Sequence, residues 1–145
     1  MLADGMPGRF ESPLRVLIAD DHRLFAEMLA TVLSIDAHVE VTGIANDGEQ
    51  AVQMATELDP MLILMDVNMP KVDGLEATRR LRAAGLNAGI ILLTGAEDAP
   101  IGPHEALAAG ANAFFSKKNS IDDLLDVFSE VASLSMLLGK QPRVQ

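Results

Sequence analysis

The sequence predicts an α/β fold: a doubly wound parallel sheet of five strands with helices on both faces. Short apolar runs alternate five times with segments of helical periodicity, which is the pattern of successive βα units. The runs LILM and IILL are apolar throughout, as strands covered on both faces must be. With 145 residues, 49% of them hydrophobic, the chain is long enough for one domain with a full core.

Five strands and five helices can be placed along the chain. The strands are expected at Leu14–Ala19, Val39–Ala45, Leu62–Met65, Gly89–Leu93 and Asn112–Phe115. The helices are expected at His22–Ile35, Asp47–Leu58, Gly74–Ala84, Pro103–Ala109 and Ile121–Leu138. The first helix repeats apolar residues with the spacing of one helical face, at Leu24, Met28, Val32 and Ile35. Side chains able to cap the second and last helices are Asn46 or Asp47, and Ser120 with Asp123.

Composition and charge exclude several classes of function. A formal net charge of −10 argues against nucleic-acid binding, because phosphate contacts need clustered Lys and Arg. The absence of cysteine excludes disulfides, a thiolate nucleophile and a cysteine-based zinc site. Residues 1–13 lack the apolar core of a signal peptide, and the longest apolar run, Met61–Met65, cannot span a bilayer. We therefore expect a cytoplasmic, soluble domain over residues 14–138, with tails at residues 1–13 and 139–145.

Polar residues follow four of the five predicted strands. Asp20 and Asp21 end the first strand, Asp66 the third and Thr94 the fourth, and Lys117 follows the fifth. In doubly wound sheets, ligands bind beyond the carboxyl ends of the strands, where the strand order reverses. In the order 2-1-3-4-5, strands one and three are neighbours and the three aspartates converge. The other common doubly wound order separates them.

Three converging carboxylates favour a bound cation. At separations of about 5 Å, each pair repels by roughly 3 kcal/mol at an effective dielectric near 20, so one group must be protonated or a cation bound. Oxygen ligands favour Mg²⁺ or Mn²⁺, whereas His22 alone is not enough for zinc. A carboxylate beside Mg²⁺ can attack phosphorus, and Lys117 and Thr94 could hold the phosphoryl oxygens. The set predicts phosphoryl transfer to an aspartate.

Four separated motifs, in order, resemble those of the receiver domain of two-component response regulators. They are the acidic pair DD, the stretch D-x-N-M-P-x-x-D-G from Asp66 to Gly74, the Thr94 strand end, and GANAFFSK with Lys117 as its last residue. The stretches ADDHRLF and VDGLEATRRLR are similar to the corresponding segments of receivers of the LuxR-type helix-turn-helix branch. The resemblance covers Leu14 to Leu138 and implies the flavodoxin-like strand order 2-1-3-4-5.

The resemblance implies a phosphoacceptor and a metal site. Asp66 matches the residue that accepts the phosphoryl group. Asp20 and Asp21 match the acidic pair that binds Mg²⁺ together with Asp66, with Asp21 as the direct ligand and Asp20 acting largely through water. Asn68 would offer its backbone carbonyl to the metal rather than its side chain.

It also implies residues that bind and report the phosphoryl group. Thr94 and Lys117 would each contact a phosphoryl oxygen, and Gly95 would leave the site open. Phe114 matches the switch aromatic, whose rotamer follows Thr94. Two features depart from the family pattern: Lys118 stands where many receivers have proline, and residues 95–103 are unusually rich in Gly, Pro and Ala.

Two other functions are alternatives to a phosphoacceptor. A magnesium-dependent phosphatase with an aspartate nucleophile would need a second acid where Asn68 stands, which argues against that class. A pseudo-receiver, which binds partners without phosphorylation, is disfavoured because all five site groups are present. His22 and His104 are interpreted as surface residues at helix starts.

The resemblance implies a sensor histidine kinase as the phosphoryl donor, and a signalling phosphoacceptor rather than an enzyme. The last helix carries a second apolar stripe, formed by Val127, Val131, Leu134 and Leu138, which predicts a partner or homodimer contact through this helix. A homodimer through the face of the fourth helix, fifth strand and fifth helix is the alternative. Only residues 139–145 follow the domain, too few for a helix-turn-helix. The chain is expected to be either a stand-alone receiver or a piece of a longer regulator.

Overall fold

The computed structural model describes residues 13–95 and 101–139 and contains all ten predicted elements. The strands are β1 (Leu14–Ala19), β2 (Val39–Ala45), β3 (Leu62–Asp66), β4 (Gly89–Thr94) and β5 (Ala113–Ser116). The helices are α1 (Arg23–Ser34), α2 (Gly48–Leu58), α3 (Gly74–Ala83), α4 (Pro103–Ala109) and α5 (Ile121–Gly139). Each boundary lies within one residue of its predicted position. The predictions for the two tails fall almost wholly outside the described residues, as does most of the 95–103 segment.

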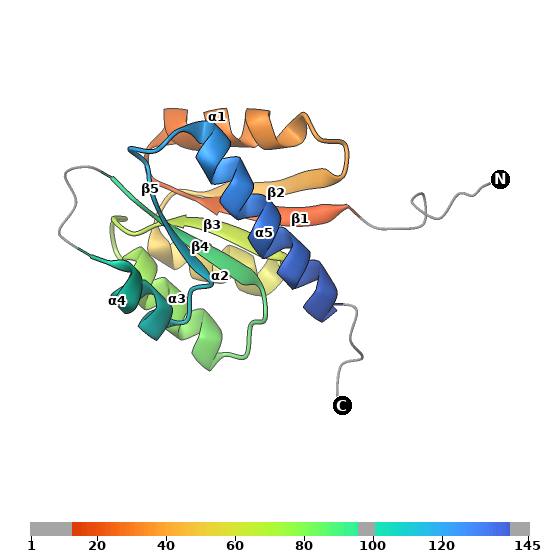
Figure 1. The fold of residues 1–145 in the computed structure, drawn as a ribbon. Coiled ribbons are helices and arrows are strands. Elements are labelled where there is room, and N and C mark those ends of the chain that lie inside the picture. Colours follow the sequence, from red (N-terminus) through yellow and green to blue (C-terminus); the bar gives the residue numbers. More distant parts are fainter. Residues whose placement is uncertain (1–12, 96–100, 140–145) are drawn as a thin grey trace.

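The five strands form one parallel sheet in the order β2-β1-β3-β4-β5. Helices α1 and α5 cover one face of this sheet, and α2, α3 and α4 cover the other (Figure 1). This arrangement confirms the predicted doubly wound, flavodoxin-like fold. Because β1 and β3 are neighbours, the residues that follow them meet at the same edge of the sheet. No helix within the described residues has both the length and the apolar character needed to cross a membrane.

Helix α1 buries a different face from the one that the apolar spacing marked. Its buried residues are Ala26, Leu29 and Leu33, which pack on the core cluster between α1, α5 and the sheet. Leu24 and Ile35 are 84% and 80% exposed. Both faces of α1 carry apolar residues at helical spacing, so periodicity alone could not decide which of them contacts the sheet.

Helix α5 packs more closely on the sheet than its apolar stripe predicted. Val131 is buried and Val127 is partly buried in the core, while Leu134 is 46% exposed. The close approach depends on Gly89 at the start of β4, where a β-carbon would lie 2.8 Å from Val131 Cγ1. Val131 and Val127 thus contribute to the core, Leu134 is the exposed member of the stripe among the described side chains, and the contact through this helix stays a prediction. The side chain of Leu138 lies outside the described residues.

The predicted capping residues lie at the starts of α2 and α5. Asp47 accepts a hydrogen bond from the backbone N–H of Gln50 at 2.7 Å, so it caps α2 in place of Asn46. Ser120 Oγ accepts from the backbone N–H of Asp123 at 3.1 Å at the start of α5. These bonds satisfy backbone donors that have no partner within the helix.

Candidate functional site

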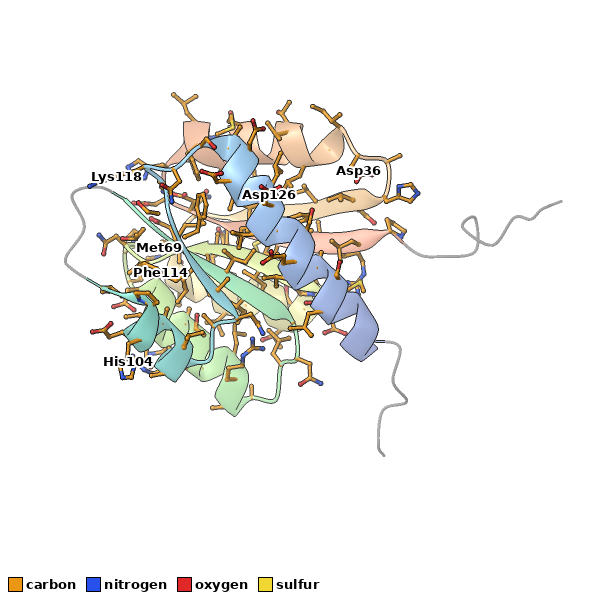
Figure 2. All side chains as sticks on the ribbon, viewed as in Figure 1. Asp36, Met69, His104, Phe114, Lys118 and Asp126 are labelled. Atoms are coloured by element: carbon orange, nitrogen blue, oxygen red, sulfur yellow. The ribbon has the colours of Figure 1, made fainter. Side chains whose placement is uncertain are left out.

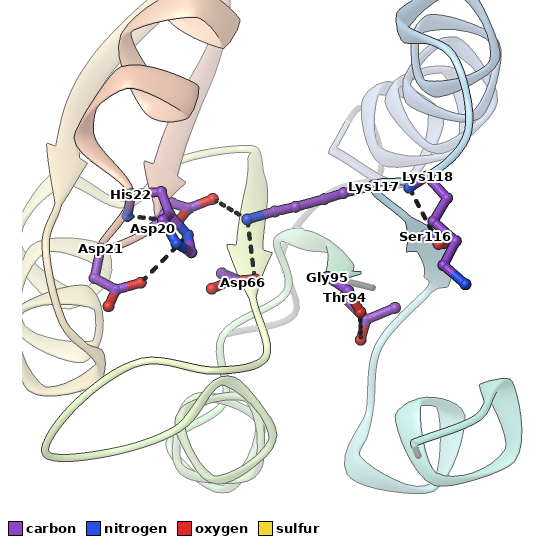
Figure 3. Close-up of polar contacts among 9 residues, drawn as sticks. All are labelled: Asp20, Asp21, His22, Asp66, Thr94, Gly95, Ser116, Lys117 and Lys118. Carbon is purple, nitrogen blue, oxygen red and sulfur yellow. Dashed lines mark hydrogen bonds and ion pairs between the residues drawn. The ribbon is translucent and has the colours of Figure 1, made fainter. Parts of the chain in front are cut away.

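Acidic side chains gather at the carboxyl ends of β1 and β3. One ligand atom from each of Asp20, Asp21, His22 and Asp66 lies within 4.8 Å of every other, and we call these four residues the acidic cluster. Asp20 and Asp66 are 0% and 2% exposed, whereas Asp21 and His22 face solvent. The structure thus brings together the three predicted aspartates, and the neighbouring positions of β1 and β3 are the reason (Figure 3).

Lys117 reaches across from the end of β5 into the acidic cluster (Figure 3). Its Nζ lies 2.8 Å from Asp20 Oδ2 and 3.3 Å from Asp66 Oδ1, and its side chain is 15% exposed. Burial alone would lower the pKa of Lys117. The hydrogen bond and charge of Asp20, with the charge of Asp66, outweigh burial and raise this pKa above its usual value. Lys117 is therefore a cation at neutral pH.

The charges of the acidic cluster and Lys117 do not balance. With all groups ionised, three carboxylates and one ammonium leave a formal charge of −2, and His22 adds none when it is neutral. A divalent cation matches that charge. The oxygen donors match the ligand preference of Mg²⁺, which is typically held by one or two carboxylates and several waters. The residues present therefore fit a magnesium ion.

Backbone contacts hold Asp20 in place. The backbone N–H of Asp20 donates to the carbonyl of Ala45 on β2 at 3.0 Å, and its Oδ1 accepts from the backbone N–H of His22 at 2.9 Å. The imidazole Nδ1 of His22 lies 3.5 Å from the same carboxylate oxygen and 3.9 Å from Asp21 Oδ1. A fixed carboxylate can orient a metal or an ammonium without losing further rotamer freedom on binding.

The loop after β3 fixes Asp66 through close packing against Gly74. The backbone N–H of Gly74 donates to the carbonyl of Val67 at 2.7 Å. A β-carbon at Gly74 would lie 2.2 Å from the carbonyl oxygen of Asp66, closer than real contacts allow. The glycine of the D-x-N-M-P-x-x-D-G stretch thus lets the start of α3 press against the backbone of Asp66.

Thr94 and Phe114 lie on neighbouring strands near the site. Thr94 ends β4, pairs with Ser116 and is half-buried, and its carbonyl accepts the backbone N–H of Lys117 at 2.8 Å. Its hydroxyl donates to the carbonyl of Gly95 at 3.4 Å. Phe114 is half-buried against the core cluster beneath α3 and α4, a cluster that includes Met69 (Figure 2). Its predicted role as a switch stays a prediction.

The remaining predicted residues lie at the surface. Asn68 is exposed in the loop between β3 and α3, and the role of its backbone carbonyl stays a prediction. His104 is exposed on α4, as expected of a surface residue (Figure 2). Lys118 is also exposed, and its backbone N–H donates to Ser116 Oγ at 3.2 Å in the turn after β5.

Two residues at the site have roles that the sequence did not suggest. His22 is exposed, as predicted, but its ring lies beside Asp20 and Asp21. Phe25 places its ring against Lys117, with Nζ 4.4 Å from the ring centroid. In the sequence, Phe25 stands about one helical turn after Asp21, on the helix that follows the acidic pair, and this position could have indicated that it lies near the site. Nothing in the spacing connected it with a residue so distant in the sequence.

Comparison with known proteins agrees with this geometry. Residues 16–129 match the model of the response regulator receiver domain family. The chain is 35% identical over 122 residues to the transcriptional regulatory protein DegU of Brevibacillus brevis, covering 84% of this chain and 51% of that protein. It therefore spans about half the length of that relative.

Solved structures give the same result. The receiver domain of the putative response regulator NarL from Mycobacterium tuberculosis superposes with a TM-score of 0.77 at 30% identity, covering 85% of this chain and 98% of that one. A LuxR-family response regulator from Aurantimonas sp. SI85-9A1 superposes with a TM-score of 0.75 at 25% identity, covering 84% and 86%. The resemblance to receivers, including those of the LuxR branch, is thereby confirmed.

Proposed function

Because this chain belongs to the response regulator receiver family of two-component signalling, we propose that it accepts a phosphoryl group on Asp66 from a sensor kinase. Receiver domains as a family bind Mg²⁺ at an acidic pocket, and the acidic cluster here has the charge and donor set for that ion. The observation that carries the proposal is the contact of Lys117 with both Asp20 and Asp66, two buried carboxylates from neighbouring strands.

In the proposed reaction, a carboxylate oxygen of Asp66 attacks the phosphorus of a phosphohistidine. The new O–P bond forms as the P–N bond breaks, and the electron pair of that bond stays on the imidazole nitrogen. A magnesium ion held by Asp20, Asp21, Asp66 and the backbone carbonyl of Asn68 would neutralise charge on the phosphoryl oxygens.

The residues around Asp66 would bind the transferred group. Lys117, which lies 3.3 Å from an Asp66 oxygen, is within reach of a phosphoryl oxygen on that residue. Thr94 would bind a second oxygen through its hydroxyl, and the change at Thr94 and Phe114 would alter the surface formed by α4, β5 and α5. The protein would act as a signalling phosphoacceptor rather than as an enzyme with a separate product.

The proposal is tested with a small-molecule donor. The protein is incubated with acetyl phosphate and Mg²⁺ and its intact mass is measured, and a gain of one phosphoryl group is expected. Borohydride reduction of the acyl phosphate followed by peptide sequencing should locate the group at Asp66. An unchanged mass in the presence of Mg²⁺ would contradict the proposal and favour a pseudo-receiver, and a phosphoryl group at another residue would contradict the assignment of Asp66.

Magnesium is expected to bind the acidic cluster and stabilise the folded protein. Added Mg²⁺ should raise the thermal midpoint in a concentration-dependent way, since a ligand that binds only the native state stabilises it. The Asp21→Asn variant should bind Mg²⁺ at least about tenfold more weakly, because a direct ligand loses its charge. Isothermal titration calorimetry measures both affinities.

Asp59→Asn is the matched control for the magnesium measurement. Asp59 is exposed at the end of α2 in a left-handed conformation that asparagine adopts well, so its removal changes the net charge equally. Equal Mg²⁺ affinities of Asp21→Asn and wild-type protein would rule out Asp21 as a ligand.

A homodimer through α5 is proposed as one way in which the signal is passed on. With Val131 in the core, Leu134 is the exposed apolar residue among the described part of the stripe, so the contact would centre there. Sedimentation of the phosphorylated protein should show concentration-dependent association that Leu134→Glu abolishes. Monomers at all concentrations in both proteins would exclude this interface.

The phosphoryl donor and the cellular compartment are proposed from membership of the receiver family. The donor would be a sensor histidine kinase, and the compartment the cytoplasm. DegU is a transcriptional regulatory protein about twice as long as the matched segment, so an output through transcription is proposed for a longer protein or a separate partner. This domain itself is not proposed to bind nucleic acid, in keeping with the net charge of −10.

A further inference from the structure

We infer that Phe25 is a positioning residue that holds the ammonium of Lys117 at the acidic cluster. Nζ of Lys117 lies over the face of the Phe25 ring, 4.4 Å from its centroid. The same nitrogen contacts Asp20 at 2.8 Å and Asp66 at 3.3 Å. Two carboxylates and one aromatic face therefore surround a single cation. The inference rests on the proposed function in so far as it assigns Lys117 to phosphoryl binding.

The position of Phe25 is set by the fold. It lies in the first turn of α1, which begins at Arg23, two residues after the acidic pair, and its side chain is half-buried against the core cluster between α1, α5 and the sheet. Lys117 enters from the end of β5, so the contact joins two segments that are far apart in the sequence. A ring anchored in the core offers a fixed surface to a flexible side chain with four rotatable bonds.

An aromatic ring differs from a polar group in how it attracts an ammonium. The negative face of the ring attracts the charge, but it takes none of the three N–H groups as a conventional hydrogen bond. Those donors remain free for Asp20, for Asp66 and, after transfer, for a phosphoryl oxygen. A carboxylate in place of Phe25 would compete for them and add to the negative charge of the cluster. The ring therefore holds Lys117 without reducing its capacity to bind phosphate.

The contact is tested first by a double-mutant cycle on stability. Phe25→Leu removes the aromatic face and keeps an apolar side chain, and Lys117→Met removes the charge and keeps the length. Urea unfolding of the wild type, both single variants and the double variant should give a coupling of roughly 3- to 10-fold in the unfolding constant. A coupling factor of about one would overturn the inference.

The positioning role is tested by the affinity for beryllofluoride, an analogue of the phosphoryl group on aspartate, in the presence of Mg²⁺. Calorimetry should show binding roughly 3- to 10-fold weaker in Phe25→Leu, with recovery in Phe25→Tyr, which restores an aromatic face of the same size. Phe128→Leu is the control, because Phe128 is a buried aromatic of the same core cluster on α5. It should lower stability and leave beryllofluoride affinity unchanged.

The outcomes separate this inference from the proposed function. Equal affinities in Phe25→Leu, Phe25→Tyr and wild-type protein would overturn the positioning role while leaving phosphoryl acceptance intact. A wild-type protein that binds no beryllofluoride and takes no phosphoryl group would instead contradict the proposed function. The double-mutant cycle would then still decide whether the ring holds the ammonium.

Discussion

Replacing Asp66 by asparagine is expected to abolish phosphoryl acceptance. Asp66 supplies the only nucleophile in the proposed reaction, and an amide oxygen carries no charge with which to attack phosphorus. Uptake from acetyl phosphate should fall by at least about a thousandfold, a loss of the size that removal of an essential nucleophile causes in enzymes. Intact-mass measurement over time gives the rate, with wild-type protein and Asp59→Asn measured in parallel.

Measuring the stability of the Asp66→Asn protein distinguishes the loss of the nucleophile from unfolding of the protein. Asp66 and Asp20 offer oxygens within 4.8 Å of each other, and two such charges repel by about 3 kcal/mol at an effective dielectric near 20. Neutralising Asp66 relieves that repulsion at the cost of one contact with Lys117, which keeps Asp20 as its closer partner. The free energy of unfolding of Asp66→Asn should therefore lie within about 1 kcal/mol of the wild-type value or above it. A fully folded Asp66→Asn protein that is phosphorylated at the wild-type rate would refute the assignment.

The second large effect is expected from Gly74→Ala. The added β-carbon would lie 2.2 Å from the carbonyl oxygen of Asp66 and 3.0 Å from Val67 Cα, both of which are backbone atoms. The chain must move to make room, so we expect a loss of at least about 3 kcal/mol in the free energy of unfolding. Urea denaturation measures it. Because the displaced carbonyl belongs to Asp66, the rate of phosphoryl uptake should also fall by about tenfold or more in the protein that remains folded.

Gly102→Ala is the matched control for Gly74→Ala. Both glycines lie at the start of a helix, but among the residues that the structure describes, a β-carbon at Gly102 would meet only the end of the flexible Glu105 side chain, at 3.3 Å. Its cost should stay within about 1 kcal/mol. A β-carbon at Gly48 would lie 1.6 Å from the carbonyl oxygen of Val72, in the loop between β3 and α3. Gly48→Ala should therefore destabilise the protein as Gly74→Ala does, which would show that the close packing of this loop causes the loss of stability. Equal stability of the Gly74 and Gly102 variants would show that the loop accommodates a side chain without strain.

Much of the candidate site could be predicted because its residues follow strands that local sequence already identifies. Asp20 and Asp66 each end an apolar run, and the rule for parallel sheets places both at one edge. The strand order, which decides whether they meet, came from the resemblance to receivers rather than from the residues themselves. The pairing of β1 with β3 confirms that order.

Less could be predicted where two faces of an element were equally apolar. In α1, the series from Leu24 to Ile35 and the series through Ala26, Leu29 and Leu33 both have helical spacing, and only packing on the sheet selected the second. In α5, the missing side chain of Gly89 admitted Val131 into the core and reduced the predicted exposed stripe. Periodicity reports which residues share a face, but not how near a neighbouring element can approach.

Local patterns in the amino-acid sequence specify the order and type of the elements and the residue types at the strand ends, because backbone propensity, helix caps and apolar patterns act over a few residues. The tertiary structure alone decided which groups contact one another: Lys117 with Asp20, 97 positions earlier, and Lys117 with the ring of Phe25. Such contacts depend on how α1 and β5 are placed around a common sheet edge. They follow from the close packing of side chains distant in the chain, and no local pattern records that packing.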